Sequence, residues 1–325
     1  MNDRIKNNLP IPDFFQPDRV REIWRVPYQQ RAEAAKNWAQ KYQMRSARQD
    51  KNRVGLLLID VQNTFCIPEF ELFVTGAVED NIRLCQFIYR NLNLITEIIP
   101  TLDTHRALAI FHPLFWLNDA GEYPEPNTII TLKDLENKKW QVNPEIAFNL
   151  KYGDLEKIKK YALYYVQKLE EDGKYPLTIW PYHSMLGGIG HALVSAVEEA
   201  IFFHNIARNS QAQFEIKGNN ILTENYSVLR GEVLEDENGN KIGSKNNTLI
   251  EKLLNFDALI IAGQAKSHCV AWTIADLLVE IKAKDPQLTK KIYLLEDCTS
   301  PVVVPGIIDL LQQQINFIKI LLDRE

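Results

Sequence analysis

The sequence predicts an α/β protein with a mainly parallel central sheet and helices on both faces, a three-layer, Rossmann-like arrangement. Two observations carry this prediction. Continuous apolar runs, each closed by polar residues, recur along the chain and are typical of strands that are buried on both faces. Segments with the apolar spacing of helices lie between these runs, and strands that alternate with helices indicate a parallel sheet.

The predicted elements of the sheet domain, in chain order, are strands at 54–60, 95–105, 256–265 and 290–300, with helices at 78–94 and directly after the turn at 263–267. Several polar side chains with useful chemistry fall at the carboxyl ends of these strands: Asp60, Asp103, His105 and Cys269. Open parallel sheets bind their ligands beyond the carboxyl ends of the strands. We therefore expect a functional site at this edge.

Two further segments surround the predicted sheet domain at 53–325. Residues 1–52 are predicted to be an N-terminal extension, in which residues 28–44 form a helix that packs on the core or on a partner subunit. Residues from about 117 to 176 are polar, contain a helical piece and predict an insertion over one edge of the sheet. Residues 232–248 contain Asn-Gly and predict an exposed hairpin or loop.

Charge and composition exclude several classes of function. The net charge of the 325-residue chain is −5, so no overall basic field favours a nucleic-acid partner. The start of the chain lacks the apolar stretch of an export signal, and no apolar run reaches the roughly 18 residues of a membrane span. We expect a cytoplasmic protein without membrane contact, whose four cysteines are free thiols.

Cys269 is the cysteine with the most suggestive surroundings. It stands at a predicted helix start, where unpaired N–H groups and the helix dipole lower the pKa of a thiol and can bind an oxyanion. A buried, inert cysteine would suit the same local context equally well. His268 precedes it, but successive helical residues point about 100° apart. The partners of a nucleophilic Cys269 are therefore expected from other strand ends, as Asp60 and a lysine.

The residues around these positions resemble the isochorismatase-like cysteine hydrolases, a superfamily that includes nicotinamidases, N-carbamoylsarcosine amidases and isochorismatases. LLLIDVQNTF, which contains Asp60, is similar to the first-strand signature of the superfamily. IIAGQAKSHCV is similar to its late signature and places Cys269 at the nucleophile position. FEIKGNNILTENYS matches the central lysine at Lys217, followed by the Tyr-Ser pair typical of nicotinamidases.

The resemblance implies an isochorismatase-like fold with a catalytic triad of Asp60, Lys217 and Cys269. Asp60 would be the general base that deprotonates the thiol and returns a proton to the leaving amine. Lys217 would hold the Asp–Cys pair and keep the thiolate available. Backbone N–H groups of Cys269 and of Ala265 or a neighbour would form an oxyanion hole, shaped by a cis peptide at Gln264–Ala265.

Two further motifs resemble the metal site of nicotinamidases. They are D-x-H at 103–105 and W-P-x-H at 180–183, in the order found in that subgroup. The resemblance implies that Asp103, His105 and His183 bind a divalent ion (zinc, manganese or iron) with a position open to a pyridine nitrogen. Polar loop residues without a metal are the alternative. The remaining histidines outside these motifs are predicted to be structural: His112, His191 and His204.

The chain departs from the family pattern near the nucleophile and in both metal motifs. Ser267 and His268 stand where the family has an Asp and an aromatic residue. Arg106 follows the D-x-H motif in place of a proline, and Ser184 follows the W-P-x-H motif in place of a cysteine. These departures affect the surroundings of the predicted triad rather than its members, so they bear on the substrate.

The sequence therefore predicts a metal-containing amidase for a small planar amide such as nicotinamide, which acts through a thioester and releases ammonia. Phe65 and Trp180 are predicted to bind the ring of the substrate, although Phe115 and Trp116 lie near the same motifs and any of the four could belong to the core. A hydrolase of ureido or aliphatic amides and a non-catalytic binding protein of the same fold are the alternatives. Self-association is expected, as in the family.

Overall fold

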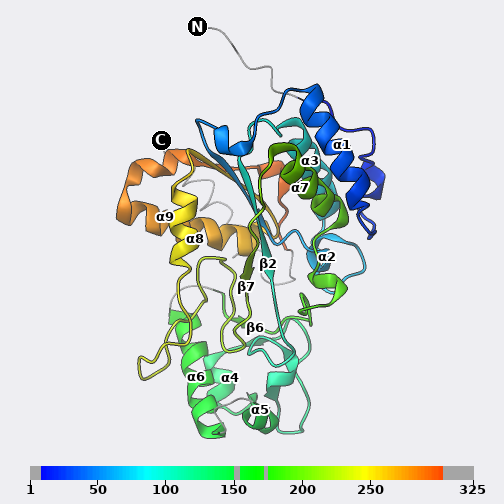
Figure 1. The fold of residues 1–325 in the computed structure, drawn as a ribbon. Coiled ribbons are helices and arrows are strands. Elements are labelled where there is room, and N and C mark those ends of the chain that lie inside the picture. The colour runs from blue at the N-terminus through cyan, green and yellow to red at the C-terminus, as the bar shows by residue number, and fades with distance from the viewer. Residues whose placement is uncertain (1–8, 150–153, 172–174, 303–325) are drawn as a thin grey trace.

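The computed structural model (Figure 1) describes residues 9–149, 154–171 and 175–302. At its centre is a five-stranded sheet in the order β7-β2-β1-β8-β9, in which every neighbouring pair is parallel. The strands are β1 (Val54–Ile59), β2 (Glu97–Asp103), β7 (Glu215–Lys217), β8 (Ala258–Gly263) and β9 (Ile292–Leu294). The predicted parallel sheet is confirmed, and β7 is an edge strand that the sequence pattern did not predict.

The central strand β1 explains why its sequence is a continuous apolar run. Leu56 pairs with Ile98 of β2 on one side and with Ile260 of β8 on the other. Successive side chains point to opposite faces of the sheet, and Leu56 and Leu57 are both fully buried in different clusters of the core. Burial on both faces removes the alternation that a half-exposed strand would show.

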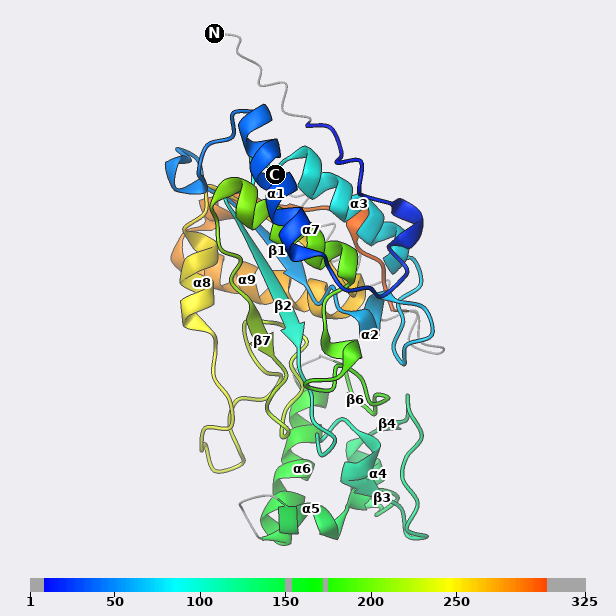
Figure 2. The same ribbon diagram turned by 45° about the vertical axis from the view of Figure 1, so that its right-hand side comes forward.

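Helices cover both faces of the sheet, as predicted (Figures 1 and 2). One face packs against α3 (Ala77–Arg90) and α7 (Ser195–Arg208), and α1 (Tyr28–Lys41) packs on α7. The other face packs against α8 (Asn247–Leu254) and α9 (Ala271–Lys284). Within the described residues, no helix is both long enough and apolar enough to cross a membrane.

The predicted helix of the N-terminal segment is confirmed as α1, and it packs on the core of its own chain. Arg31 of α1 forms a 2.7 Å ion pair with Glu199 of α7. The N–H of Trp24 donates to Ser195 Oγ at 2.9 Å, and this hydroxyl donates to the Trp24 carbonyl at 2.9 Å. Residues 1–8 of the predicted extension lie outside the described residues.

The residues between β3 and β6 form a lobe, defined here as 116–178. Its elements are β3 (Trp116–Leu117), β4 (Ile129–Ile130), α4 (Leu132–Glu136), β5 (Gln141–Val142), α5 (Pro144–Asn149), α6 (Leu155–Glu171) and β6 (Leu177–Thr178). β3 pairs with β5 and β4 pairs with β6, both antiparallel. Residues 150–153 and 172–174 are not described.

The lobe lies beyond the carboxyl ends of the strands (Figures 1 and 2). Residues 116–178 therefore cover the carboxyl edge of the sheet, whereas the sequence predicted only that such a segment packs over one edge. Their length and polarity indicate an added segment, but they do not specify the side on which it packs. Farther along the chain, an isolated antiparallel bridge between Glu235 and Lys241 forms the turn that was predicted for residues 232–248.

Candidate active site

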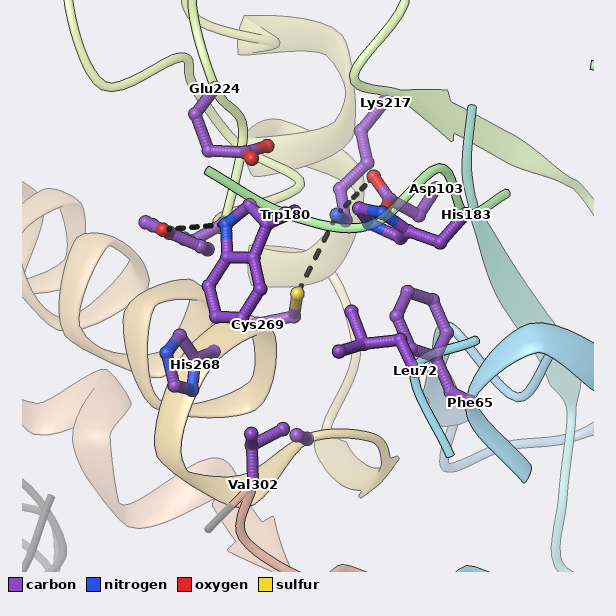
Figure 3. Close-up of a pocket in the computed structure, with 12 residues that line it drawn as sticks. Phe65, Leu72, Asp103, Trp180, His183, Lys217, Glu224, His268, Cys269 and Val302 are labelled. Atoms are coloured by element: carbon purple, nitrogen blue, oxygen red, sulfur yellow. Dashed lines mark hydrogen bonds and ion pairs between the residues drawn. The ribbon is translucent and has the colours of Figure 1, made fainter. Parts of the chain in front are cut away.

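Four neighbouring strands bring chemically active side chains to one point at the carboxyl edge of the sheet. Asp60 directly follows β1, Asp103 ends β2 and Lys217 ends β7. Cys269 follows β8 after a short turn, in a π-helical stretch (Lys266–Val270) that leads into α9. Figure 3 shows the Cys269 thiol pointing toward the Lys217 ammonium, with Asp103 beside the lysine.

Lys217 is the centre of this arrangement. Its Nζ lies 3.1 Å from Asp60 Oδ2, 2.8 Å from Asp103 Oδ1 and 3.6 Å from Cys269 Sγ. It also donates a hydrogen bond to the Asn225 carbonyl at 2.8 Å. Burial lowers the pKa of Lys217, but the charges of Asp103 and Asp60 outweigh burial and hold it well above its ordinary value. The side chain is therefore a permanent ammonium. The three residues of the predicted triad lie together around it.

The Asp60 carboxylate is fixed beside the lysine by a threonine of β2. The Asp60 N–H donates to Thr101 Oγ1 at 3.0 Å, and this hydroxyl donates to Asp60 Oδ1 at 2.5 Å. Burial raises the pKa of Asp60, with Lys217 and the Thr101 hydrogen bond acting in the opposite direction. A carboxylate with a raised pKa is a stronger base than an exposed one, which suits proton transfer near neutral pH.

The turn between β8 and Cys269 requires a glycine at its start. Gly263 has a φ of +114°, and a Cβ at this position would lie 2.0 Å from the Ile59 carbonyl oxygen. The peptide bond between the following two residues, Gln264–Ala265, is cis, as the resemblance implied. The Gln264 amide is fixed away from the nucleophile because it donates to Asp80 Oδ2 at 2.9 Å. Ala265 lines the cavity at Cys269.

The Cys269 thiol is protonated in this site. Burial raises its pKa well above the ordinary value, and the Lys217 charge opposes this only in part. The helix start was expected to favour the thiolate, but burial has the larger effect and raises the pKa of this thiol. A protonated thiol needs a base before it can act as a nucleophile.

Beside this group, Asp103, His105 and His183 form a second cluster. Asp103 Oδ2 lies 2.7 Å from His105 Nε2 and 3.4 Å from His183 Nε2. The ligand atoms of the three residues all lie within 4.8 Å of one another. The other ring nitrogens are held by carbonyl oxygens, because His105 Nδ1 lies 3.2 Å from the Gly218 oxygen and His183 Nδ1 lies 2.8 Å from the Pro181 oxygen. Metal-binding histidines typically have such second partners, so these residues fit a divalent ion.

The charge of Asp103 and the absence of a side chain at Gly218 both suit the cluster of Asp103, His105 and His183 to a cation. Burial raises the pKa of Asp103, but the His105 and Lys217 charges and the hydrogen bonds of the cluster hold it well below its usual range, so the group is an anion. Gly218, with a φ of +77°, lies against the cluster. A Cβ there would lie 2.7 Å from His105 Cε1 and 2.8 Å from Asp103 Oδ1.

A small cavity, lined by both Cys269 and His183, connects the nucleophile with this cluster (Figure 3). The predicted aromatic residues Phe65 and Trp180 both line it. Phe115 and Trp116 do not, and both are fully buried in the core. The remaining lining residues mix apolar and charged groups: Leu72, Asp103, His183, Lys217, Glu224, Tyr226, Ala265, His268, Cys269 and Val302.

Glu224 and Tyr175 are site residues that the sequence did not reveal. Glu224 lines the cavity, and burial raises its pKa to about 7. Tyr175, next to the lobe's last strand, stacks on the His268 ring at 4.5 Å and donates to the Ser267 carbonyl at 2.7 Å. Glu224 stands seven residues after Lys217 in a stretch without regular structure, so no periodic pattern marks it.

His268 is neutral and is turned toward its neighbours. Its Nδ1 lies 2.9 Å from Ser267 Oγ, and burial lowers its pKa to about 3. The ring packs against Tyr175, Trp180 and Tyr226. This environment agrees with the expectation that His268 is poorly placed to act as the base for Cys269.

His112 lies closer to the cluster of Asp103, His105 and His183 than expected. Its ring packs at 5.7 Å from the His105 ring and at 5.8 Å from the His183 ring. Burial, together with these two histidines, lowers the pKa of His112 to about 2, so it is a neutral packing partner of the cluster. His191 has a structural contact, since its Nε2 lies 2.8 Å from Thr104 Oγ1.

Comparison with known proteins identifies the fold. The chain matches no family model, and it matches no curated protein sequence. The structure of yeast nicotinamidase Pnc1p bound to the inhibitor nicotinaldehyde is similar to it, with 18% identity over 82% of this chain and 96% of that chain and a TM-score of 0.50. The chain has the fold of yeast nicotinamidase. This finding confirms the predicted isochorismatase-like fold.

A second structure, an Acinetobacter baumanii nicotinamidase and pyrazinamidase, is 18% identical over 83% of this chain and 94% of that chain, with a TM-score of 0.49. At 18% identity, the comparison with yeast nicotinamidase shows the fold alone. The chemistry of the chain has to be inferred from its own side chains.

Proposed function

We propose that this chain is a cysteine amidohydrolase that cleaves the C–N bond of a small, planar, nicotinamide-like amide. The observation that carries the proposal is the position of Lys217, whose ammonium contacts Asp60, Asp103 and Cys269 in one buried site. This contact joins a base, a nucleophile and a candidate metal ligand. The nicotinaldehyde complex of yeast nicotinamidase supports a ligand of this class.

In the first half-reaction, Asp60 takes the thiol proton as Cys269 Sγ attacks the amide carbonyl carbon. A C–S bond forms, and the carbonyl oxygen becomes an oxyanion that the backbone N–H groups of Cys269 and Ala265 stabilise. Asp60 then gives its proton to the amide nitrogen, the C–N bond breaks and ammonia leaves. The product is a thioester on Cys269.

In the second half-reaction, Asp60 takes a proton from water as the water oxygen attacks the thioester. The C–S bond breaks, the proton returns to the sulfur, and the carboxylic acid is released. Lys217 remains an ammonium throughout. Its charge stabilises both the Asp60 carboxylate and the sulfur anion, which offsets part of the cost of burying them.

Asp103, His105 and His183 would hold a divalent ion, and their donor atoms suit zinc, manganese or iron. Such an ion would supply a Lewis acid with positions open to a substrate nitrogen or to water. Phe65 and Trp180 would bind the faces of a planar ring beside it.

A panel of amides tests the substrate class. Ammonia release is measured from nicotinamide, pyrazinamide, maleamate and ureidoacrylate with metal-reconstituted protein, and Cys269→Ala serves as the control for contaminating amidases. We expect the two aromatic amides to have the highest kcat/KM. A preference for ureidoacrylate or maleamate would favour a ureido or aliphatic amide hydrolase, and absence of turnover with every compound would contradict the proposal.

A further inference from the structure

The position of the Lys217 ammonium depends on a main-chain carbonyl in a stretch of turns. Lys217 Nζ donates to the Asn225 oxygen at 2.8 Å, the same distance as to Asp103. An ammonium has three N–H groups at fixed angles, so the direction of one hydrogen bond constrains the other two. Asn225 lies between β7 and α8, where the backbone forms turns and bends. The carbonyl therefore has to be held by contacts from elsewhere.

Two tyrosines of α6 supply such contacts. Tyr161 Oη donates to the Leu222 carbonyl at 2.8 Å, and Tyr165 Oη accepts from the Glu224 N–H at 3.1 Å. Both side chains are buried, at 4% and 0% exposure. Residues four apart share one face of a helix, so α6 presents two hydroxyls, one turn apart, to alternate residues of the stretch that leads to Asn225.

We propose that Tyr161 and Tyr165 are positioning residues that fix residues 222–226 and thereby aim the Lys217 ammonium at Asp60 and Cys269. The inference rests on the role of Lys217 in the proposed function. It also assigns a task to the lobe, because α6 belongs to the segment that packs beyond the strand ends (Figure 1). The lobe would then take part in organising the nucleophile.

Residues 222–226 also make hydrogen bonds that do not involve the two tyrosine hydroxyls. We therefore expect removal of one hydroxyl to shift this stretch rather than to unfold it. The Glu232 N–H donates to the Glu224 carbonyl at 2.8 Å, and the Val233 N–H donates to Thr223 Oγ1 at 3.1 Å. Loss of the Tyr165 hydroxyl removes a partner of the Glu224 N–H while these contacts persist. The adjacent Asn225 carbonyl is then free to move relative to Lys217.

Alkylation of Cys269 measures this effect without any substrate. The second-order rate of carbamidomethylation by iodoacetamide is determined at Cys269 by peptide mapping in the wild type, Tyr165→Phe and Tyr161→Phe. We expect each variant to react about tenfold more slowly, within the range that a misplacement of about 1 Å can cost. Because no amide is involved, failure of the proposed amidase activity would leave this result intact.

Two matched variants of α6 separate positioning from stability. Tyr164→Phe makes the same change on a half-buried tyrosine of the helix, and Val166→Ala removes buried apolar volume while both tyrosine hydroxyls stay in place. Both should alkylate at the wild-type rate, although Val166→Ala should lower the melting temperature. Wild-type alkylation rates of Cys269 in folded Tyr165→Phe and Tyr161→Phe would overturn the proposal. It would also be overturned if Val166→Ala slowed alkylation in proportion to its loss of stability. If one tyrosine variant does not fold, the other carries the test.

Discussion

The Lys217 ammonium lies 3.6 Å from Cys269 Sγ, and both groups are buried. Burial raises the pKa of the thiol, and the lysine is the nearby positive charge that opposes this rise. Before the reaction, Cys269 is therefore a neutral thiol, and the Lys217 ammonium is already placed to stabilise the thiolate that it forms. It becomes a thiolate only when a base removes its proton, and Asp60, which pairs with the same lysine and hydrogen-bonds the thiol, is placed to do so.

Lys217→Met should remove the charge that stabilises the Cys269 thiolate. The same change removes the ion-pair partner of two buried carboxylates. We expect kcat/KM to fall by at least about 100-fold, the scale of losing one preorganised electrostatic contact. Stability should fall by about 3–5 kcal/mol, because Asp60 and Asp103 lose their shared counter-ion. Lys245→Met is the matched control, since Lys245 pairs with Glu280 at the surface. An equal loss of activity in both variants, measured on folded protein, would contradict this role.

Gly218→Ala should weaken metal binding for a steric reason. The added Cβ would meet His105 and Asp103 at less than 3 Å, so the cluster has to open. Gly239→Ala is the control, because Gly239 has nearly the same φ, +76° against +77°, and has no heavy atom within 4 Å of a built Cβ. We expect the bound zinc, manganese or iron, measured by elemental analysis after desalting, to fall only in Gly218→Ala. Equal metal content in the two variants would show that the cluster does not hold the ion.

Cys269 should be the most reactive of the four thiols toward iodoacetamide near neutral pH. It lines the cavity beside Lys217, whereas Cys66 and Cys85 are fully buried and Cys298 is 3% exposed. Burial raises the pKa of all four thiols, so the expected difference rests on the Lys217 ammonium, which lies 3.6 Å from Cys269 Sγ and stabilises its thiolate. Site-resolved mass spectrometry gives the four rates. Equal rates would favour a non-catalytic protein of the same fold.

His204 should make the protein less stable in acid. It is fully buried against the Ile95 carbonyl, and burial lowers its pKa from 6.5 to about 4. The unfolded chain binds a proton at pH values where the native state does not, so stability is complete above about pH 6.5 and is lost as the pH falls toward 4. The loss attributable to His204 is about 3 kcal/mol. Urea unfolding of the wild type and of His204→Asn between pH 7 and 4 measures it, and parallel pH profiles would contradict this assignment.

Asp60 and Cys269 could be singled out because each follows a predicted strand within a short local pattern, whereas the metal-binding role of Asp103, His105 and His183 came from resemblance and stays a prediction. Asp60 closes an apolar run that β1 buries on both faces, and Cys269 follows the glycine that the turn after β8 requires. Lys217 could be identified only by resemblance. Its strand, β7, has three residues and an exposed Ile216, so it lacks the apolar signal of a buried strand.

Other features depend on packing that the sequence does not show. The helix α7 was not predicted, because it buries polar residues such as Glu199, His204 and Arg208 together with its apolar ones and so lacks a clear polar face. The raised pKa of Cys269 reflects burial, which the local helix start does not reveal. In the sequence, Tyr161 and Tyr165 occupy ordinary apolar positions of an amphipathic helix. Only the structure shows that their hydroxyls hydrogen-bond the backbone of residues 222–226.

The central claim is that Cys269 is the nucleophile of an amidohydrolase. Its most direct test is ammonia release from nicotinamide by metal-loaded wild type and by Cys269→Ala, with circular dichroism and metal content measured on the same samples. The account predicts turnover by the wild type and a loss of at least about 10⁴-fold in the variant, the scale found when a covalent nucleophile is removed, with fold and metal retained. Turnover by a folded, metal-loaded Cys269→Ala protein at a rate near that of the wild type would contradict it.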